Sequence, residues 1–255
     1  MLSGRPSSTE PASGGTARGA VPRKRTPGAP VTGYRAVRDR VETYFDRTAT
    51  ETWERLTSEA PVSRVRATVR AGRDRMRAVI LAQLPEDLSG ARVLDAGCGA
   101  GQLSAALAAR GADVLAVDIS PRLLAVAKAR MPEGLPGQVI FTADDMLDPS
   151  FGPFDYVVGM DSLIYYDAPS VARAVGGLAE RCSGPVVFTL PPRTPLLMAM
   201  WGAGRLFPRA DRAPLMVPQT RDRVAREMGT VGARLREIER VNSGFYISTC
   251  LEVAP

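Results

Sequence analysis

The chain has 255 residues, of which 45% are hydrophobic, and a formal net charge of +6; this length allows one α/β domain with extensions. The absence of histidine excludes catalytic triads, metal sites and general bases that need an imidazole. Cys98, Cys182 and Cys250 are isolated, so they predict neither a disulfide framework nor a zinc site. The lack of histidine and of paired cysteines also leads us to expect no bound metal. No apolar stretch reaches the roughly 18 residues of a membrane span and no signal-peptide core is evident, so we expect a cytoplasmic protein.

Residues 1–33 are rich in Gly, Pro, Ser, Thr and Ala without apolar periodicity, which is typical of a disordered tail. The tail carries one acid, Glu10, and five basic residues: Arg5, Arg18, Arg23, Lys24 and Arg25. Most of the net charge therefore lies in the tail. Because the folded part carries little net charge, we expect no nucleic-acid groove there. The tail either solubilises the protein or attracts it weakly to an anionic membrane surface.

Residues 34–84 have the periodicity of two helices separated at Pro61, and we expect them to form an N-terminal cap over the site. Short apolar strands then alternate with helices over residues 85–255, as in a parallel, doubly wound sheet. Strands are predicted at 91–96, 112–118, 138–142, 154–160 and 185–190, and helices at 102–110, 121–130 and 169–181. The last two strands, 233–241 and 244–253, flank a short turn at 242–244 and are predicted to form an antiparallel hairpin.

The most informative stretch runs from Val93 to Gly101 and reads V-L-D-A-G-C-G-A-G. Glycines at alternate positions let the backbone turn sharply beside a ligand. A dinucleotide site usually reads G-x-G-x-x-G, whereas the carboxylate of Asp95 before the first glycine would repel a pyrophosphate and attract a cation. The pattern resembles motif I of the class I methyltransferases, whose donor S-adenosylmethionine carries a sulfonium and an ammonium group. A dinucleotide site and a tight turn without a ligand remain alternatives.

This motif and the order of elements together predict an α/β, Rossmann-like class I methyltransferase fold, with a seven-stranded, mostly parallel sheet. Ligands of such sheets bind at the carboxyl ends of the strands. Asp118 ends the second strand, where it would accept hydrogen bonds from the ribose, and Asp144 by resemblance suits the adenine amino group, unless it is a loop acid or a helix cap. The residues predicted to bind the cofactor are Asp95, Gly97, Gly99, Gly101, Asp118, Ile119, Asp144, Met146 and Met160.

An apolar segment flanked by prolines and arginines lies at 192–214, between the fifth strand and the hairpin. Met-rich apolar surfaces adapt to varied partners, and arginines bind carboxylates. We interpret the segment as a lid over a large, flat, apolar acid; a packed helix with solvated arginines is the alternative. The residues predicted to bind the substrate are Arg193, Met200, Trp201, Arg205 and Arg209.

Several stretches together resemble the magnesium-protoporphyrin IX O-methyltransferases of chlorophyll and bacteriochlorophyll biosynthesis. They are 41–46 with Trp53, 62–66, 93–101, 160–166 and 192–209. The resemblance implies methyl transfer from S-adenosylmethionine to a propionate of magnesium-protoporphyrin IX, with Tyr44 and Tyr165 in the catalytic site. It also implies contact with magnesium chelatase and a peripheral position on the photosynthetic membrane.

Two positions depart from the family pattern, because Tyr165 and Arg73 stand where histidines are common. The chemistry tolerates this loss, since a carboxylic acid with a pKa of roughly 4 is already ionised at neutral pH and needs no general base. Methylation of another apolar molecule, such as a quinone or polyketide, and a non-catalytic cofactor-binding role remain alternatives.

Overall fold

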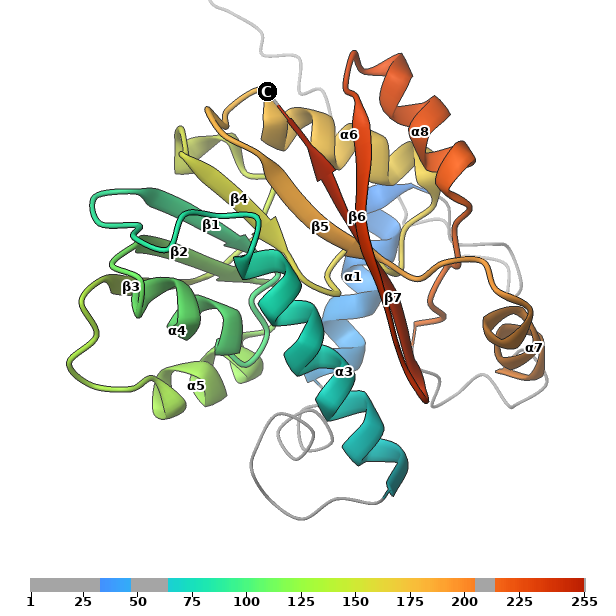
Figure 1. Ribbon diagram of the computed structural model, residues 1–255, viewed down its shortest axis with the longest axis horizontal. Coiled ribbons are helices and arrows are strands. Elements are labelled where there is room, and N and C mark those ends of the chain that lie inside the picture. The colour runs from blue at the N-terminus through green and yellow to red at the C-terminus, as the bar shows by residue number, and fades with distance from the viewer. Residues whose placement is uncertain (1–32, 47–63, 205–213, 255) are drawn as a thin grey trace, which may run out of the picture. The chain divides into compact units, whose positions relative to one another are not determined.

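The computed structural model describes residues 33–46, 64–204 and 214–254. Its strands form one sheet in the order β3-β2-β1-β4-β5-β7-β6 (Figure 1). β1 to β5 pair in parallel, whereas β7 is antiparallel to both of its neighbours. The predicted class I methyltransferase topology is confirmed. The strands are β1 (Arg92–Ala96), β2 (Asp113–Asp118), β3 (Gln138–Ala143), β4 (Tyr156–Gly159), β5 (Val186–Leu190), β6 (Leu235–Ser243) and β7 (Tyr246–Val253).

Helices connect the strands and follow the predicted positions closely. Helix α5 begins as the sequence indicates, because Ser120 Oγ accepts a hydrogen bond from the backbone N–H of Leu123 at 3.3 Å and Pro121 occupies the first turn. The helices are α1 (Tyr34–Tyr44), α3 (Arg64–Leu81), α4 (Gln102–Ala108), α5 (Pro121–Arg130), α6 (Ala168–Ala179), α7 (Pro195–Gly204) and α8 (Arg221–Thr230), with a 3-10 turn η2 (Pro149–Phe151). Within the described ranges, no helix is both long and apolar enough to cross a membrane.

The C-terminal hairpin turns two residues later than expected. Ser243 pairs with Tyr246, so the turn consists of Gly244 and Phe245 alone. Gly244 has φ +59°, a left-handed conformation that glycine adopts without steric cost. The sequence predicts the turn at 242–244. Strand β6 instead continues to Ser243, because Gly244 is the residue that adopts positive φ.

The core consists of two apolar layers, one on each face of the sheet. Side chains alternate along a strand, so β1 contributes to both layers. Leu94 packs in the same cluster as Val175 of α6. Val93 packs in the cluster that contains Ile80 of α3. Both faces of β1 are therefore buried, as its continuous apolar sequence indicates.

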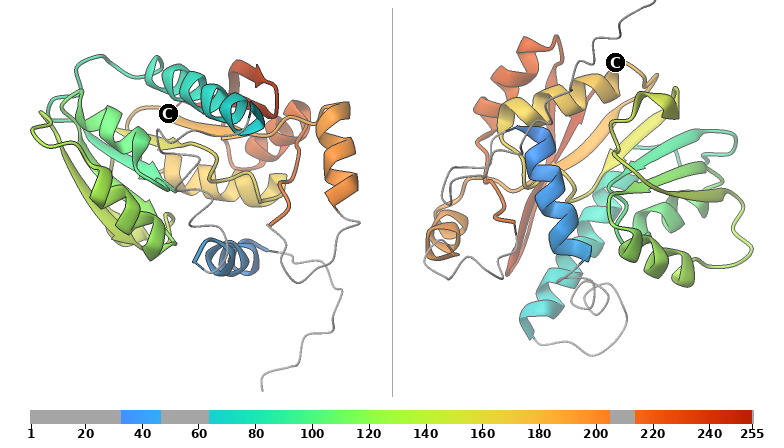
Figure 2. Two further views of the ribbon diagram at one scale, coloured as in Figure 1. Left: turned by 90° about the horizontal axis from the view of Figure 1, so that it is seen from below. Right: turned by 180° about the vertical axis from the view of Figure 1, so that it is seen from behind.

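The two N-terminal helices lie on opposite sides of the sheet rather than together (Figure 2). α3 contacts β6 and β7 and buries Met76 and Ile80 in the core. Val41 of α1 and Phe45, which follows α1 directly, instead pack against Leu123 at the start of α5. Each helix follows its own apolar stripe to a different surface, so the two helices reach the site from two sides.

Candidate active site

A pocket opens at the carboxyl ends of β1, β2 and β4, where sheets of this kind bind ligands. It encloses about 970 Å³ of empty space, including solvent at its mouth. The pocket brings together most of the residues predicted to bind the cofactor: Asp95, Gly97, Gly99, Asp118, Ile119, Asp144, Met146 and Met160. Gly101 belongs to the same predicted set but does not line the pocket.

The glycines of the motif all have positive φ, but they serve two different purposes. The φ angles are +82° at Gly97, +54° at Gly99 and +77° at Gly101. A Cβ atom on Gly97 would overlap the side chain of Ser162, and one on Gly101 would lie 2.9 Å from Cβ of Ala127. A Cβ on Gly99 would meet nothing within 4 Å. Gly97 and Gly101 therefore allow close packing, whereas Gly99 leaves space for a ligand to approach the backbone.

Asp95 is a buried carboxylate at the base of the pocket, with 1% of its surface exposed. Ser104 Oγ donates a hydrogen bond to it at 2.6 Å, and among the described residues it has no cationic partner. Burial raises the pKa of Asp95 to about 7, although the hydrogen bond from Ser104 opposes this shift. A ligand that brings a positive charge would favour the ionised carboxylate.

Asp118 holds the glycine-rich loop as well as facing the pocket. Its Oδ2 accepts a hydrogen bond from the backbone N–H of Gly99 at 2.8 Å, and its Oδ1 accepts one from the N–H of Ser120 at 2.9 Å. Burial raises the pKa of Asp118 to about 6, against the effect of these two hydrogen bonds. The carboxylate thus ties the end of β2 to the loop after β1.

The loop after β4 contains a second acid with unusual geometry. Asp161 has φ +58°, the one positive value at a non-glycine among the described residues. Its carboxylate pairs with Arg73 of α3 at 2.5 Å and accepts hydrogen bonds from Tyr246 at 3.0 Å and Thr189 at 3.2 Å. Gly72 permits this arrangement, because a Cβ there would lie 2.6 Å from the Tyr246 ring. Strained backbone held by several contacts is typical of functional sites.

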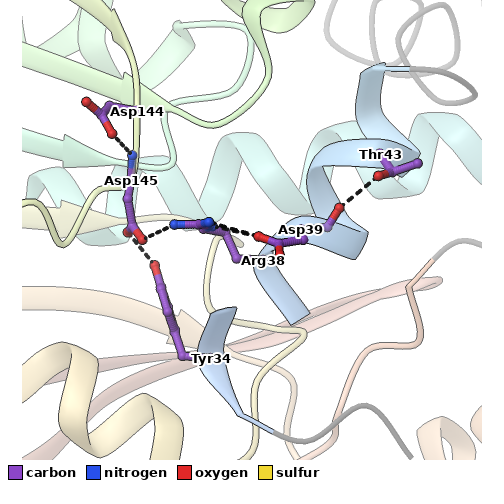
Figure 3. A network of polar contacts seen from close by, with 6 residues as sticks. All are labelled: Tyr34, Arg38, Asp39, Thr43, Asp144 and Asp145. Carbon is purple, nitrogen blue, oxygen red and sulfur yellow. Dashed lines mark hydrogen bonds and ion pairs between the residues drawn. The ribbon is translucent and has the colours of Figure 1, made fainter. Parts of the chain in front are cut away.

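α1 is fastened over the other side of the pocket by contacts with the loop after β3 (Figure 3). Tyr34 donates a hydrogen bond to Asp145 at 2.7 Å, and Arg38 pairs with the same carboxylate at 2.9 Å. The neighbouring Asp144 accepts a hydrogen bond from the backbone N–H of Asp145 at 2.7 Å. At the far end of α1, Ser120 donates a hydrogen bond to Asp46 at 2.7 Å. The helix is thus held at both ends to loops that border the pocket.

The two predicted catalytic tyrosines are close to each other. Tyr44 and Tyr165 both pack against the cluster of Val41, Phe45 and Leu123, and Tyr165 also lines the pocket. Burial is the main cause that raises the pKa of both phenols above the ordinary value. Both side chains therefore stay protonated at neutral pH, where each can donate a hydrogen bond but cannot act as a base. Tyr44 does not itself line the pocket, so its catalytic role stays a prediction.

The predicted substrate arginines do not lie at this pocket within the described part of the chain. Arg193 is exposed and lines a second cleft, bordered by Gln219 and Arg240. Arg205 and Arg209 lie outside the described residues, as do the side chains of Met200 and Trp201, although α7 itself forms a helix over 195–204. The substrate role of these residues stays a prediction.

Comparison with known proteins identifies the family. The chain is 55% identical over 223 residues to a magnesium-protoporphyrin O-methyltransferase of Rhodobacter capsulatus, covering 87% of this chain and 98% of the relative. The chain belongs to the magnesium-protoporphyrin O-methyltransferase family. A family model described as the magnesium-protoporphyrin IX methyltransferase C-terminus matches residues 159–255, and a general methyltransferase domain matches residues 93–182.

Other members of the family agree in sequence and in fold. A chloroplastic magnesium protoporphyrin IX methyltransferase of Arabidopsis thaliana is 32% identical, covering 84% of this chain and 70% of the relative. The crystal structure of the Synechocystis PCC 6803 magnesium protoporphyrin IX methyltransferase with bound SAH superposes with a TM-score of 0.72 at 28% identity, covering 85% of this chain and 98% of that one. The resemblance inferred from residues 41–46, 93–101 and 160–166 is confirmed.

Some residues at the site of this methyltransferase are not identified by any sequence motif. Arg77 lines the pocket from α3, and the Asp145 contacts hold α1, yet none of these residues belongs to a recognisable motif. The sequence marks Arg73 only as a departure from the family pattern. The available signal was the spacing of Arg73 and Arg77, which places both on one face of a helix.

Proposed function

We propose that this chain transfers a methyl group from S-adenosylmethionine to a propionate carboxylate of magnesium-protoporphyrin IX, giving the monomethyl ester, in bacteriochlorophyll biosynthesis. The observation that carries the proposal is the pocket of the glycine motif in a member of this family, with the buried carboxylate of Asp95, which has no cationic partner in the described part of the chain. Family membership supplies the acceptor, because the pocket alone is compatible with many acceptors.

The residues of the pocket fit the donor. Asp95 offers a carboxylate to a ligand that carries two positive groups, and Gly99 leaves its backbone open to close approach. Asp118 would accept the ribose hydroxyls, while Ile119 and Asp144 border the space for the adenine. The donor supplies an electrophilic methyl group on its sulfonium; the protein's contribution is to hold the donor and the acceptor in line and to exclude water.

The tyrosines act as hydrogen-bond donors in this proposal. A propionate is ionised at neutral pH, so its oxygen attacks without loss of a proton. Tyr165, whose raised pKa keeps it protonated, can orient that carboxylate through its hydroxyl from the wall of the pocket. Tyr44 supports Tyr165 through the apolar cluster that both share.

A direct assay tests the proposed activity. Purified full-length protein is mixed with S-adenosylmethionine and magnesium-protoporphyrin IX, and the product is examined by mass spectrometry. We expect one product that is heavier than the substrate by one CH2 unit and whose ester is cleaved by mild base. A catechol quinone precursor in place of the porphyrin is the control. Methylation of the control alone would indicate a quinone methyltransferase, and donor binding without any product would indicate a non-catalytic relative.

The pH dependence of the reaction distinguishes a carboxylate acceptor from a phenol. At saturating S-adenosylmethionine, kcat/KM for the porphyrin should be flat from about pH 6 to 8, because a group with a pKa of roughly 4 has finished titrating. Saturation is necessary since the free protein binds its donor in a pH-dependent way through Asp95. A rise of slope one across this range would contradict the mechanism without a base.

We also propose that the protein contacts magnesium chelatase and associates peripherally with a membrane. Contact with magnesium chelatase is supported by the family resemblance. Peripheral membrane association is supported by the basic residues of 1–33 and the apolar composition of α7. Co-sedimentation of the full-length protein with anionic vesicles, compared with a chain that lacks residues 1–32, tests the membrane proposal.

A further inference from the structure

The charges around the pocket are unevenly distributed. Its described walls carry four carboxylates and two guanidinium groups, and both arginines come from α3: Asp95, Asp118, Asp144, Asp161, Arg73 and Arg77. The arginines are four residues apart, so they project from the same face of the helix. S-adenosylmethionine has one negative group, the α-carboxylate of its methionine part. Among the described residues that line the pocket, an entering anion can therefore meet a cation only on α3.

Arg73 already forms an ion pair with a carboxylate of the protein. It pairs with Asp161 at 2.5 Å, and the two side chains are only 16% and 8% exposed. Tyr246 and Thr189 complete the hydrogen bonds of this carboxylate. Separating a buried pair leaves a buried charge without compensation, which costs far more than breaking a surface pair. Arg73 therefore positions Asp161 and is not free to take a second carboxylate.

Arg77 differs in this respect. Its Nη2 atom contacts Asp74 at 2.8 Å, and Asp74 is 51% exposed while the arginine itself is 22% exposed. An ion pair with an exposed partner contributes little and is easily replaced. A guanidinium group has five N–H donors in a planar fork, and within the described ranges this contact with Asp74 is the one polar contact of Arg77. The Arg77 guanidinium can therefore bind a ligand carboxylate without breaking a buried ion pair.

The position of Arg77 indicates which end of the donor it meets. Met76 and Ile80, on the neighbouring turns of α3, belong to the same apolar cluster as Cys98 and Leu103. Arg77 also lines the same pocket as Gly97, Cys98 and Gly99 of the glycine-rich loop. The adenosine end belongs to the opposite wall, around Asp118, Ile119, Asp144 and Met146 in the proposed site. Arg77 consequently borders the methionine end.

We propose that Arg77 binds the α-carboxylate of S-adenosylmethionine and thereby orients the donor. This inference rests on the proposed function. The acceptor carboxylate is the less suitable partner, because a bidentate arginine would occupy the oxygen lone pairs that must attack the methyl group. The donor carboxylate takes no part in the reaction, so a tight charge-assisted contact with it orients the donor at no cost to the chemistry.

Binding measurements on the full-length protein test the assignment without turnover. Calorimetry would compare S-adenosylmethionine with its decarboxylated form, which lacks only the α-carboxylate. We expect Arg77→Gln to weaken binding of S-adenosylmethionine by about 10- to 100-fold, the usual effect of losing a hydrogen bond to a charged group. The decarboxylated ligand should bind the variant as it binds the wild type. Arg77→Lys, which keeps the charge without the fork, should fall between the two.

Arg75→Gln is the matched control, since Arg75 lies on the same helix but pairs with Glu239 at the surface, where its side chain is 63% exposed. It should bind both ligands normally. Equal loss of both ligands in Arg77→Gln, or loss of neither, would overturn the assignment. Unchanged donor affinity with a raised KM for the porphyrin would assign Arg77 to the acceptor instead. A wild-type protein that binds neither ligand would overturn the proposed function itself.

Discussion

Gly97→Ala is expected to destabilise the protein by on the order of 3 kcal/mol. The added methyl group would overlap the side chain of Ser162, and alanine would also pay for the φ of +82°. Ser162 follows Asp161, whose carboxylate contacts Arg73 and Tyr246 and whose backbone N–H donates a hydrogen bond to Thr189, so moving the loop after β4 away would break these contacts. Urea denaturation of the ligand-free protein measures the loss as a lower midpoint with an unchanged slope.

Gly99→Ala is the matched control for this substitution. It pays a similar conformational cost of about 1 kcal/mol at a φ of +54°, but its methyl group meets nothing within 4 Å. The variant should remain folded and lose affinity for S-adenosylmethionine, because the methyl group occupies the space left for the ligand. If the two variants lost equal stability, the close contact between Gly97 and Ser162 would not be the cause.

Asp95→Asn is expected to stabilise the ligand-free protein and to weaken donor binding severely. Burial raises the pKa of Asp95 from 3.8 to about 7. The folded state therefore holds a proton that the unfolded chain has lost, and stability falls as pH rises from about 4 to 7 and is lowest above pH 7. Asparagine removes this penalty while still accepting the hydrogen bond from Ser104. The gain should be on the order of 4 kcal/mol at pH 8, from about three pKa units at roughly 1.4 kcal/mol each, and should vanish near pH 4.

Donor binding should show the opposite dependence on the same group. A cationic ligand favours the ionised carboxylate, so wild-type affinity should be about ten-fold lower at pH 6 than at pH 8, as expected for a pKa near 7. Asp95→Asn should bind weakly at both pH values and should release no proton on binding, which calorimetry in buffers of different ionisation enthalpy detects. A variant that kept both the wild-type stability and the pH-dependent affinity would refute the role of Asp95.

The elements of the fold were predictable because their signals are local. The apolar run before Asp95 predicts β1, Ser120 and Pro121 predict the start of α5, and the glycines predict a ligand-binding turn. The hairpin was predicted but misplaced by two residues, since the turn depends on which residue can adopt positive φ. These inferences use interactions within a few residues of the chain, and such interactions are visible in a sequence.

Site residues were predictable from the sequence where they follow the carboxyl end of a strand. Parallel strands bring their carboxyl ends to one edge, so Asp118 and Met160 could be placed near Asp95 without coordinates. The two N-terminal helices were harder, because their amphipathic stripes do not specify which face of the sheet they cover. The sequence thus placed α1 and α3 together, whereas packing separates them.

The amino-acid sequence by itself determined the fold class, the family and the donor-binding motif, because motif and topology follow from periodicity and from glycines at set positions. Only the tertiary structure decided which cations face the pocket. Arg73, Asp161 and Tyr246 come from three separate segments of the chain, and their contact depends on how closely α3 packs against β7 at Gly72. Long-range charge pairing of this kind leaves no periodic pattern, so the position of Arg77 on the pocket wall depends on the tertiary structure.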